Sequence, residues 1–163
     1  MKKSSKRIGE ILIGRGRITE AQVLDALKDQ KLSGKFLGNI LVEKGLLSEA
    51  EVTGALGEQF DLPLVNISAE NVDMELIRKF SSALVIDHKC VPLKEDETSV
   101  TVAISNPLDA VALAKLEEEA NPRILNLVLA SEQDIERVVG EYRKYISDSI
   151  QRLLKRKPPE ASA

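Results

Sequence analysis

Glycines recur at one fixed spacing in the first third of the chain, at positions where backbone without a side chain could contact a ligand directly. The paired positions are 29 residues apart: Gly9 with Gly38, and Gly16 with Gly45. A glycine inside a helix costs about 1 kcal/mol relative to alanine, and the pattern accepts this cost at Gly9 and again at Gly38. Two interpretations stay open: two helices approach closely there, or backbone lies against a flat ligand.

Residues with catalytic or metal-binding chemistry are few. His88 is the only histidine, and its neighbours Asp87 and Cys90 have no distant partners that would complete a zinc site. Neighbours on one strand or loop rarely give a cysteine–histidine pair its geometry. The single Gly34–Lys35 pair lacks the flanking residues of a phosphate loop. We therefore predict no enzyme, no metal site, no cofactor and no ATP hydrolysis.

The composition is that of an ordinary globular chain. The net charge is −3, aromatic residues make up only 3%, and tryptophan is absent, which argues against base stacking on single-stranded nucleic acid. Residues 1–62 are close to neutral, so we expect no DNA binding. One cysteine fits a reducing compartment. With no secretory signal and no long apolar run, we predict a cytoplasmic protein without direct membrane insertion.

Each copy of the repeat predicts a short helix, a tight turn and a longer helix. Capping boxes are predicted at Thr19 with Gln22 and at Ser48 with Glu51, because a hydroxyl and a residue three places on can satisfy free amides of the first turn. The glycine that precedes each box is typical of a helix end. The two copies therefore predict four helices.

After residue 62 the pattern changes to short segments of both kinds. We expect a helix over 73–80, strands over 89–93, 99–104 and 124–129, a helix over 108–120, and a long helix capped by Ser131. The predicted fold class is α+β: a four-helix tandem-repeat subdomain followed by a small α-β-β-α-β-α subdomain. The predicted limits are 1–62, 63–155 and a disordered tail over 156–163.

The doubled motif resembles the N-terminal domain of type II secretion and type IV pilus extension ATPases, whose ligand-binding form is the MshEN domain. Residues 91–93 and 102–109 add to the resemblance, which covers about residues 7–145. The matching positions are Arg7, Ile8, Gly9, Leu12, Ile13, Gly16, Ile18, Val23, Leu27 and Gln30 in the first copy, and Leu37, Gly38, Leu41, Val42, Gly45, Leu46, Leu47, Val52, Leu56 and Gln59 in the second.

The resemblance implies binding of cyclic di-GMP, which offers two phosphates and two guanine bases. Arg7 would stack on a guanine face or pair with its acceptors, and Gly9 and Gly38 would admit the ligand to the backbone. Either Asn106 or Asp109 would close the site. Gln30 and Gln59 would hydrogen-bond to the ligand. Aliphatic side chains would line its flat faces, namely Leu12, Val23, Leu27, Leu41, Val52 and Leu56. The candidate set is completed by Ile8, Leu37, Gly16 and Gly45.

The sequence departs from the family pattern at two places. Phe36 stands where the second copy would carry arginine, and Arg17 stands where an aliphatic residue is expected. Phe36 could stack on guanine without charge, and Arg17 could either approach a phosphate or spoil an apolar wall. These departures favour an alternative function: a ligand-free domain that docks a secretion or pilus ATPase to its inner-membrane partner.

The motif of an ATPase domain is missing from this sequence. We therefore expect either a free-standing regulatory module or a part of a larger protein. In both cases the predicted partners are cyclic di-GMP and a protein of the secretion or pilus machinery.

Overall fold

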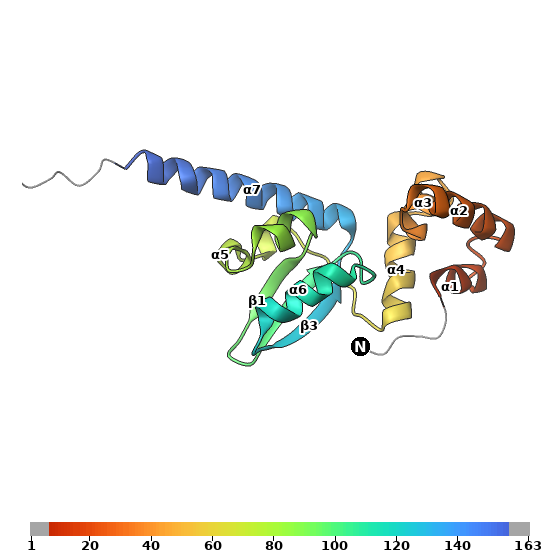
Figure 1. Cartoon of the computed structure of the whole chain (residues 1–163), viewed down its shortest axis with the longest axis horizontal. Coiled ribbons are helices and arrows are strands. Elements are labelled where there is room, and N and C mark those ends of the chain that lie inside the picture. The colour runs from red at the N-terminus through yellow and green to blue at the C-terminus, as the bar shows by residue number, and fades with distance from the viewer. Residues whose placement is uncertain (1–6, 157–163) are drawn as a thin grey trace, which may run out of the picture.

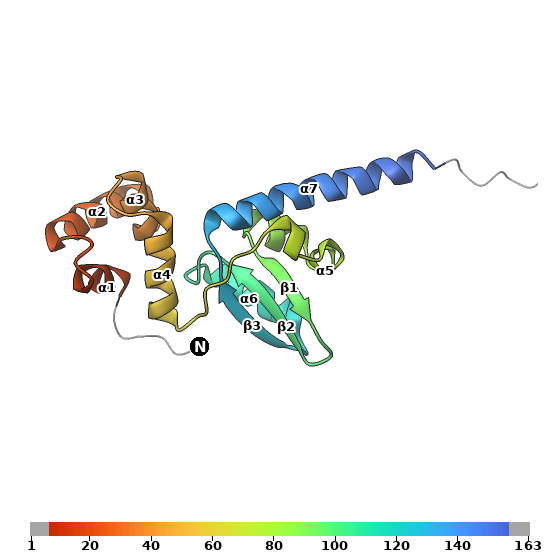
Figure 2. The same cartoon turned by 180° about the vertical axis from the view of Figure 1, so that it is seen from behind.

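A computed structural model describes residues 7–156, with a helical N-terminal part and a second half built on a small sheet (Figures 1 and 2). The tail expected over 156–163 lies, apart from Arg156, outside the described residues. No described helix is long and apolar enough to cross a membrane. The elements are α1 (Ile8–Gly14), α2 (Glu20–Ser33), α3 (Leu37–Glu43), α4 (Glu49–Phe60), η1 (Ala69–Asn71), α5 (Met74–Arg78), η2 (Ala83–Asp87), β1 (Val91–Glu95), β2 (Ser99–Ile104), α6 (Ala110–Ala120), β3 (Ile124–Leu129) and α7 (Glu132–Leu154).

The two copies of the repeat fold alike, as predicted. Thr19 with Gln22 and Ser48 with Glu51 both form complete capping boxes. Gly16 follows the end of α1 in a left-handed conformation with φ +68°, and the amide of Arg17 donates to Leu12 O over 3.1 Å. Gly45 repeats this arrangement in the second copy. Both short helices therefore end in the common way, with a left-handed glycine that lets the next amide bond to a carbonyl of the last turn.

Gly9 and Gly38 allow the two helices of each copy to pack closely. A methyl group built at Gly38 would lie 2.5 Å from Val52 Cγ1, and one built at Gly9 would lie 3.3 Å from Val23 Cγ1. Each valine belongs to the longer helix of the same copy. The first interpretation of these glycines, close helix–helix approach, is therefore correct, and it applies most strictly to Gly38.

The second half is a three-stranded sheet with helices against it. β1 pairs antiparallel with β2, and β2 pairs in parallel with β3. The parallel pair is joined through α6, which lies over one face of the sheet (Figure 1). α7 contacts β1 and then extends well beyond the sheet (Figures 1 and 2). The predicted α-β-β-α-β-α order and α+β class are confirmed.

Several predicted boundaries in the second half are wrong by about two residues. The helix expected over 73–80 ends at Arg78, and the strand expected over 89–93 ends at Glu95. β1 starts at Val91 rather than at Lys89, because Lys89 has a φ of +54° that no strand accepts, and a π-helical turn precedes it. α6 starts at Ala110 rather than at residue 108. Asn106 Oδ1 accepts from the Leu108 amide over 2.9 Å in a local turn, and Asp109 is the residue that caps the helix.

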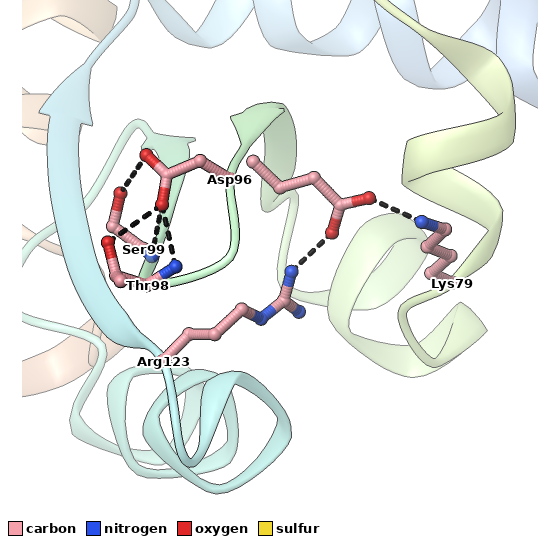
Figure 3. A network of polar contacts seen from close by, with 6 residues as sticks. Lys79, Asp96, Thr98, Ser99 and Arg123 are labelled. Carbon is pink, nitrogen blue, oxygen red and sulfur yellow. Dashed lines mark hydrogen bonds and ion pairs between the residues drawn. The ribbon is translucent and has the colours of Figure 1, made fainter.

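The hairpin between β1 and β2 is fixed by carboxylates (Figure 3). Glu95 pairs with both Lys79 and Arg123. Asp96 accepts hydrogen bonds from the backbone and hydroxyl groups of Thr98 and Ser99 over 2.7–2.9 Å. The Thr98 amide and the other donors lower the pKa of Asp96 to about 2, so the turn depends on an ionised carboxylate.

Gly38→Ala should lower the free energy of unfolding by about 1–2 kcal/mol. The new methyl meets a valine that is stiff about χ1, and the overpacking of about 1–3 kcal/mol outweighs the helix propensity gained. Gly54→Ala is the matched control, because its nearest neighbour would be Arg15 Nη1 at 3.8 Å; it should stabilise by about 0.5–1 kcal/mol. Urea unfolding measures both. A Gly38→Ala variant as stable as Gly54→Ala would contradict the packing role.

Asp96→Asn should reduce the acid sensitivity of the fold. The folded state lowers the pKa of Asp96, so its ionised form contributes stability that is complete above about pH 4 and is lost as the pH falls towards about 2. Asparagine keeps an acceptor oxygen but does not titrate. Urea unfolding at pH 5 and pH 2.5 should show a smaller loss for Asp96→Asn than for the wild type, while Glu97→Gln in the same turn should behave like the wild type.

Candidate ligand-binding cleft

A cavity of about 980 Å³ lies between the helical repeat and the second half. This size is at the upper end of the range of about 300–1,000 Å³ that is usual for small-ligand sites. One wall comes from the repeat, α1 to α4. The other comes from the end of η2 and the two residues after it (87–89), from the segment after β2 (105–109), and from Glu132 at the start of α7.

The repeat wall of the cavity is itself doubled. Nearly every residue that one copy contributes is matched by the residue 29 positions later. Helix packing thus turns the sequence repeat into two similar half-walls that face one space. The paired lining residues are Arg7/Phe36, Ile8/Leu37, Gly9/Gly38, Glu10/Asn39, Glu20/Glu49, Val23/Val52, Leu24/Thr53, Leu27/Leu56 and Gln30/Gln59.

Gln59 is an unsatisfied polar group at this wall. Its side chain is only 6% exposed, and among the described residues its Oε1 is the buried side-chain nitrogen or oxygen without a hydrogen-bond partner. Leaving such a group unpaired costs about 1–3 kcal/mol. Since Gln59 lines the cavity, a ligand with an N–H or O–H group could supply the missing donor.

The charges of the cavity are mostly negative. Arg7 is the cation available to a ligand, because in the described part of the chain its guanidinium has no hydrogen-bond or ion-pair partner. Lys89 pairs with Glu132 at 2.9 Å and Glu136 at 2.6 Å, and these bonds, Glu136 first, raise the pKa of Lys89 against the effect of burial. The lining carboxylates are Glu10, Glu20, Glu49, Asp87, Asp109 and Glu132.

The second half supplies polar groups, some of which already form hydrogen bonds within the protein. Asp109 Oδ1 accepts from the Ala112 amide at 3.0 Å, and its Oδ2 lies 2.9 Å from His88 Nδ1. Burial opposes ionisation of Asp109, but the Ala112 amide and then His88 outweigh it and lower the pKa of this carboxyl. Asn106 lines the same edge, and its amide nitrogen has no protein partner among the described residues.

Comparison with known proteins places the chain in a family. A model of the MshEN domain matches residues 60–156, which is more than half of the chain. The chain belongs to the MshEN domain family. No protein of curated function matches the sequence.

Solved structures extend this likeness over the repeat. A structure of MshE with cdg is 26% identical with a TM-score of 0.73, and the match covers 86% of this chain and 99% of that one. The N-terminal domain of XpsE is 23% identical with a TM-score of 0.65, covering 86% and 96%; this second likeness supports the fold alone. The predicted relation to N-terminal domains of secretion and pilus ATPases is confirmed.

Five predicted site residues of this MshEN chain do not line the cavity. Leu12 and Leu41 are 1% and 0% exposed, because they face the core between the helices, so the expectation that they line the ligand is wrong. Gly16 and Gly45 form the turns at the far ends of α1 and α3. Arg17 pairs with Glu51, so it neither approaches the cavity nor spoils its wall.

The remaining fourteen predicted site residues all line the cavity, together with others that the sequence reasoning missed. Glu10 and Asn39, Glu20 and Glu49, and Leu24 and Thr53 were not singled out, because the 29-residue spacing marks them as equivalent pairs but does not show that they face the cleft. His88 and Lys89 carried no such signal, because only the fold brings them to the cleft. Those predicted and placed there are Arg7, Ile8, Gly9, Val23, Leu27, Gln30, Phe36, Leu37, Gly38, Val52, Leu56, Gln59, Asn106 and Asp109.

One hydrogen bond ties the repeat to α7 across the cleft. Glu49 Oε1 accepts from the backbone amide of Gln133 over 2.9 Å, in the first turn of α7, where amides lack partners within the helix. Ser131 caps the neighbouring amide of Asp134 over 3.1 Å. The start of α7 is therefore capped by its own chain segment and by the repeat.

Glu49→Ala should loosen the first turn of α7. Loss of a cap costs about 1 kcal/mol, so the Gln133 amide should exchange about five times faster with solvent. Glu20→Ala is the matched control, since Glu20 has the same position in α2 and no partner on α7 in the described structure. Amide hydrogen exchange followed by NMR measures both. Equal exchange of Gln133 in the two variants would show that the contact does not hold the halves together.

Proposed function

We propose that this chain is a regulatory module that binds cyclic di-GMP in the cleft between the repeat and the second half. The observation that carries this proposal is the doubled wall, in which paired residues 29 positions apart face one cavity. Cyclic di-GMP consists of two identical halves, so each half of the ligand meets one copy of the repeat. A ligand made of two similar halves matches this arrangement better than a ligand without that symmetry.

The residue types of the cleft suit the chemistry of this ligand. Apolar side chains such as Leu27 and Leu56 offer surfaces on which flat bases can lie. Gln59 provides an acceptor for a guanine N–H group or a ribose hydroxyl, and this bond would remove its unsatisfied state. Arg7 provides a cation that can stack on a base or pair with a phosphate.

The comparison with MshE supports the same ligand. The solved MshE structure was described with cdg, an abbreviation of cyclic di-GMP, and nearly all of that chain is covered by the match. We further propose that the chain works in the cytoplasm and performs no catalysis. A change in the packing of the repeat against the second half would then be sensed by a protein of the secretion or pilus machinery.

Isothermal titration with cyclic di-GMP, together with two exchanges between the copies, tests the proposal. Arg7→Phe makes the first copy resemble the second and should weaken binding about tenfold, because it removes the available cation. Phe36→Arg makes the second copy resemble the first and should strengthen binding by up to about tenfold. Arg17→Ala, at an exposed ion pair outside the cleft, is the control and should leave the affinity unchanged.

Two outcomes would count against this function. One is the absence of heat at high micromolar concentrations of the nucleotide. The other is binding that none of the substitutions at positions 7 and 36 affects, since that would place the ligand away from the doubled wall.

A ligand-free docking domain is the second candidate, and the far half of α7 favours it. This helix extends beyond the sheet (Figures 1 and 2), and Ile150, Leu153 and Leu154 are 51%, 58% and 80% exposed. An apolar stripe on an extended helix suits a protein partner. A pull-down that recovers a membrane-platform protein equally with and without the nucleotide would favour docking over ligand sensing.

A further inference from the structure

His88 is held in a defined position at the edge of the cleft. Its Nδ1 lies 2.9 Å from Asp109 Oδ2, and Asp109 is fixed in turn as the cap of α6. The next residue, Lys89, has a left-handed backbone with φ +54° and bonds to two glutamates of α7. His88 is thus anchored through its own side chain to α6 and through its neighbour to α7.

One nitrogen of this imidazole remains for a ligand. Because Nδ1 faces a carboxylate, it carries a proton in every state of the ring. Nε2 has no partner among the described residues, and His88 lines the cavity. A backbone held in a sparsely populated conformation beside an oriented polar group is common at functional sites. The pattern resembles a binding group held ready rather than a core histidine with both nitrogens satisfied.

We propose that His88 is the ligand-binding residue by which the second half closes the cleft, its Nε2 donating to a phosphate oxygen of the bound dinucleotide. The inference rests on the proposed function and adds a residue and a pH dependence to it. A neutral ring with its proton on Nδ1 has only an acceptor at Nε2 and cannot donate to a phosphate. Donation from Nε2 therefore requires the doubly protonated ring, so binding takes up a proton at His88 wherever the free ring is neutral.

The charges around His88 favour the protonated ring in the complex. Asp109 contacts it directly and Asp87 precedes it, while a bound phosphate would add a third negative charge. Lys89 is paired with two glutamates, so this group of three side chains adds no net positive charge beside the ring. The other charged groups that line the same cavity are Arg7, Glu10, Glu20, Glu49 and Glu132. The Cys90 thiol beside it does not take part, because burial raises the pKa of that thiol to about 12.

The chain has one histidine, so a single imidazole signal reports its protonation without assignment by mutation. NMR titration between pH 5.5 and pH 8 should show this signal titrating at a higher pH with cyclic di-GMP than without it, by about one pH unit. Calorimetry should then show affinity rising about tenfold from pH 8 to pH 5.5. Buffers of different ionisation enthalpy should reveal uptake of a proton on binding.

Two substitutions separate the roles of the ring nitrogens. His88→Asn keeps a donor near Nδ1 for Asp109 but removes Nε2, so affinity at pH 5.5 should fall about tenfold and its pH dependence should vanish. His88→Gln keeps a neutral donor near Nε2, so it should bind with intermediate affinity that does not change with pH. If both variants unfold at the same temperature as the wild type, the changes in affinity come from lost ligand contacts and not from a destabilised fold.

The outcomes are distinct. Binding that is equally tight at pH 5.5 and pH 8, or an imidazole signal that titrates at the same pH with and without nucleotide, overturns the role of His88 and leaves the proposed function standing. Absence of binding at every pH overturns both.

Discussion

Close packing within each helical hairpin is the constraint on which the rest of the structure depends. Gly9 packs against Val23, and Gly38 packs against Val52. A methyl group added at Gly38 would lie only 2.5 Å from the Val52 side chain. In both copies, the glycine of the short helix faces a valine of the longer helix 14 positions later. Residues at matched positions then point in matched directions, and the cleft acquires a wall with two similar halves.

The two interpretations of these glycines turn out to be compatible. The glycines are buried against valines, yet both also line the cavity. Packing is the reason that no side chain is tolerated, and access to the cavity is a consequence of the missing side chain. A single residue type can thus set the geometry of a helical hairpin and leave its backbone open towards a ligand.

Local signals in the sequence were sufficient for most elements of the fold. The capping boxes fixed the starts of α2 and α4, and β-branched alternation fixed β2, because these patterns depend on residues only a few positions apart. The π-helical turn at Ala83–Asp87 and the left-handed Lys89 carry no such signal. Lys89 is held by glutamates of α7, more than forty positions away, so only the assembled fold specifies its conformation.

The candidate site shows the same division between local and distant information. The 29-residue spacing predicted which residues of the two copies are equivalent, but not which side of each helix faces the cleft. Leu12 and Leu41 share the repeat with Leu27 and Leu56, yet the first two are sealed in the core. The family model likewise covers residues 60–156 and leaves out most of the repeat, whereas structural likeness to MshE extends over it.

The central claim is that one ligand occupies both copies of the repeat at once. The most direct measurement is the change in backbone amide NMR signals of residues 7–59 during titration with cyclic di-GMP. The account predicts saturation at one nucleotide per chain, with shifts that come in pairs 29 residues apart around Gly9 and Gly38 and that follow one binding curve. Shifts confined to one copy, or two copies that saturate with different affinities, would contradict it.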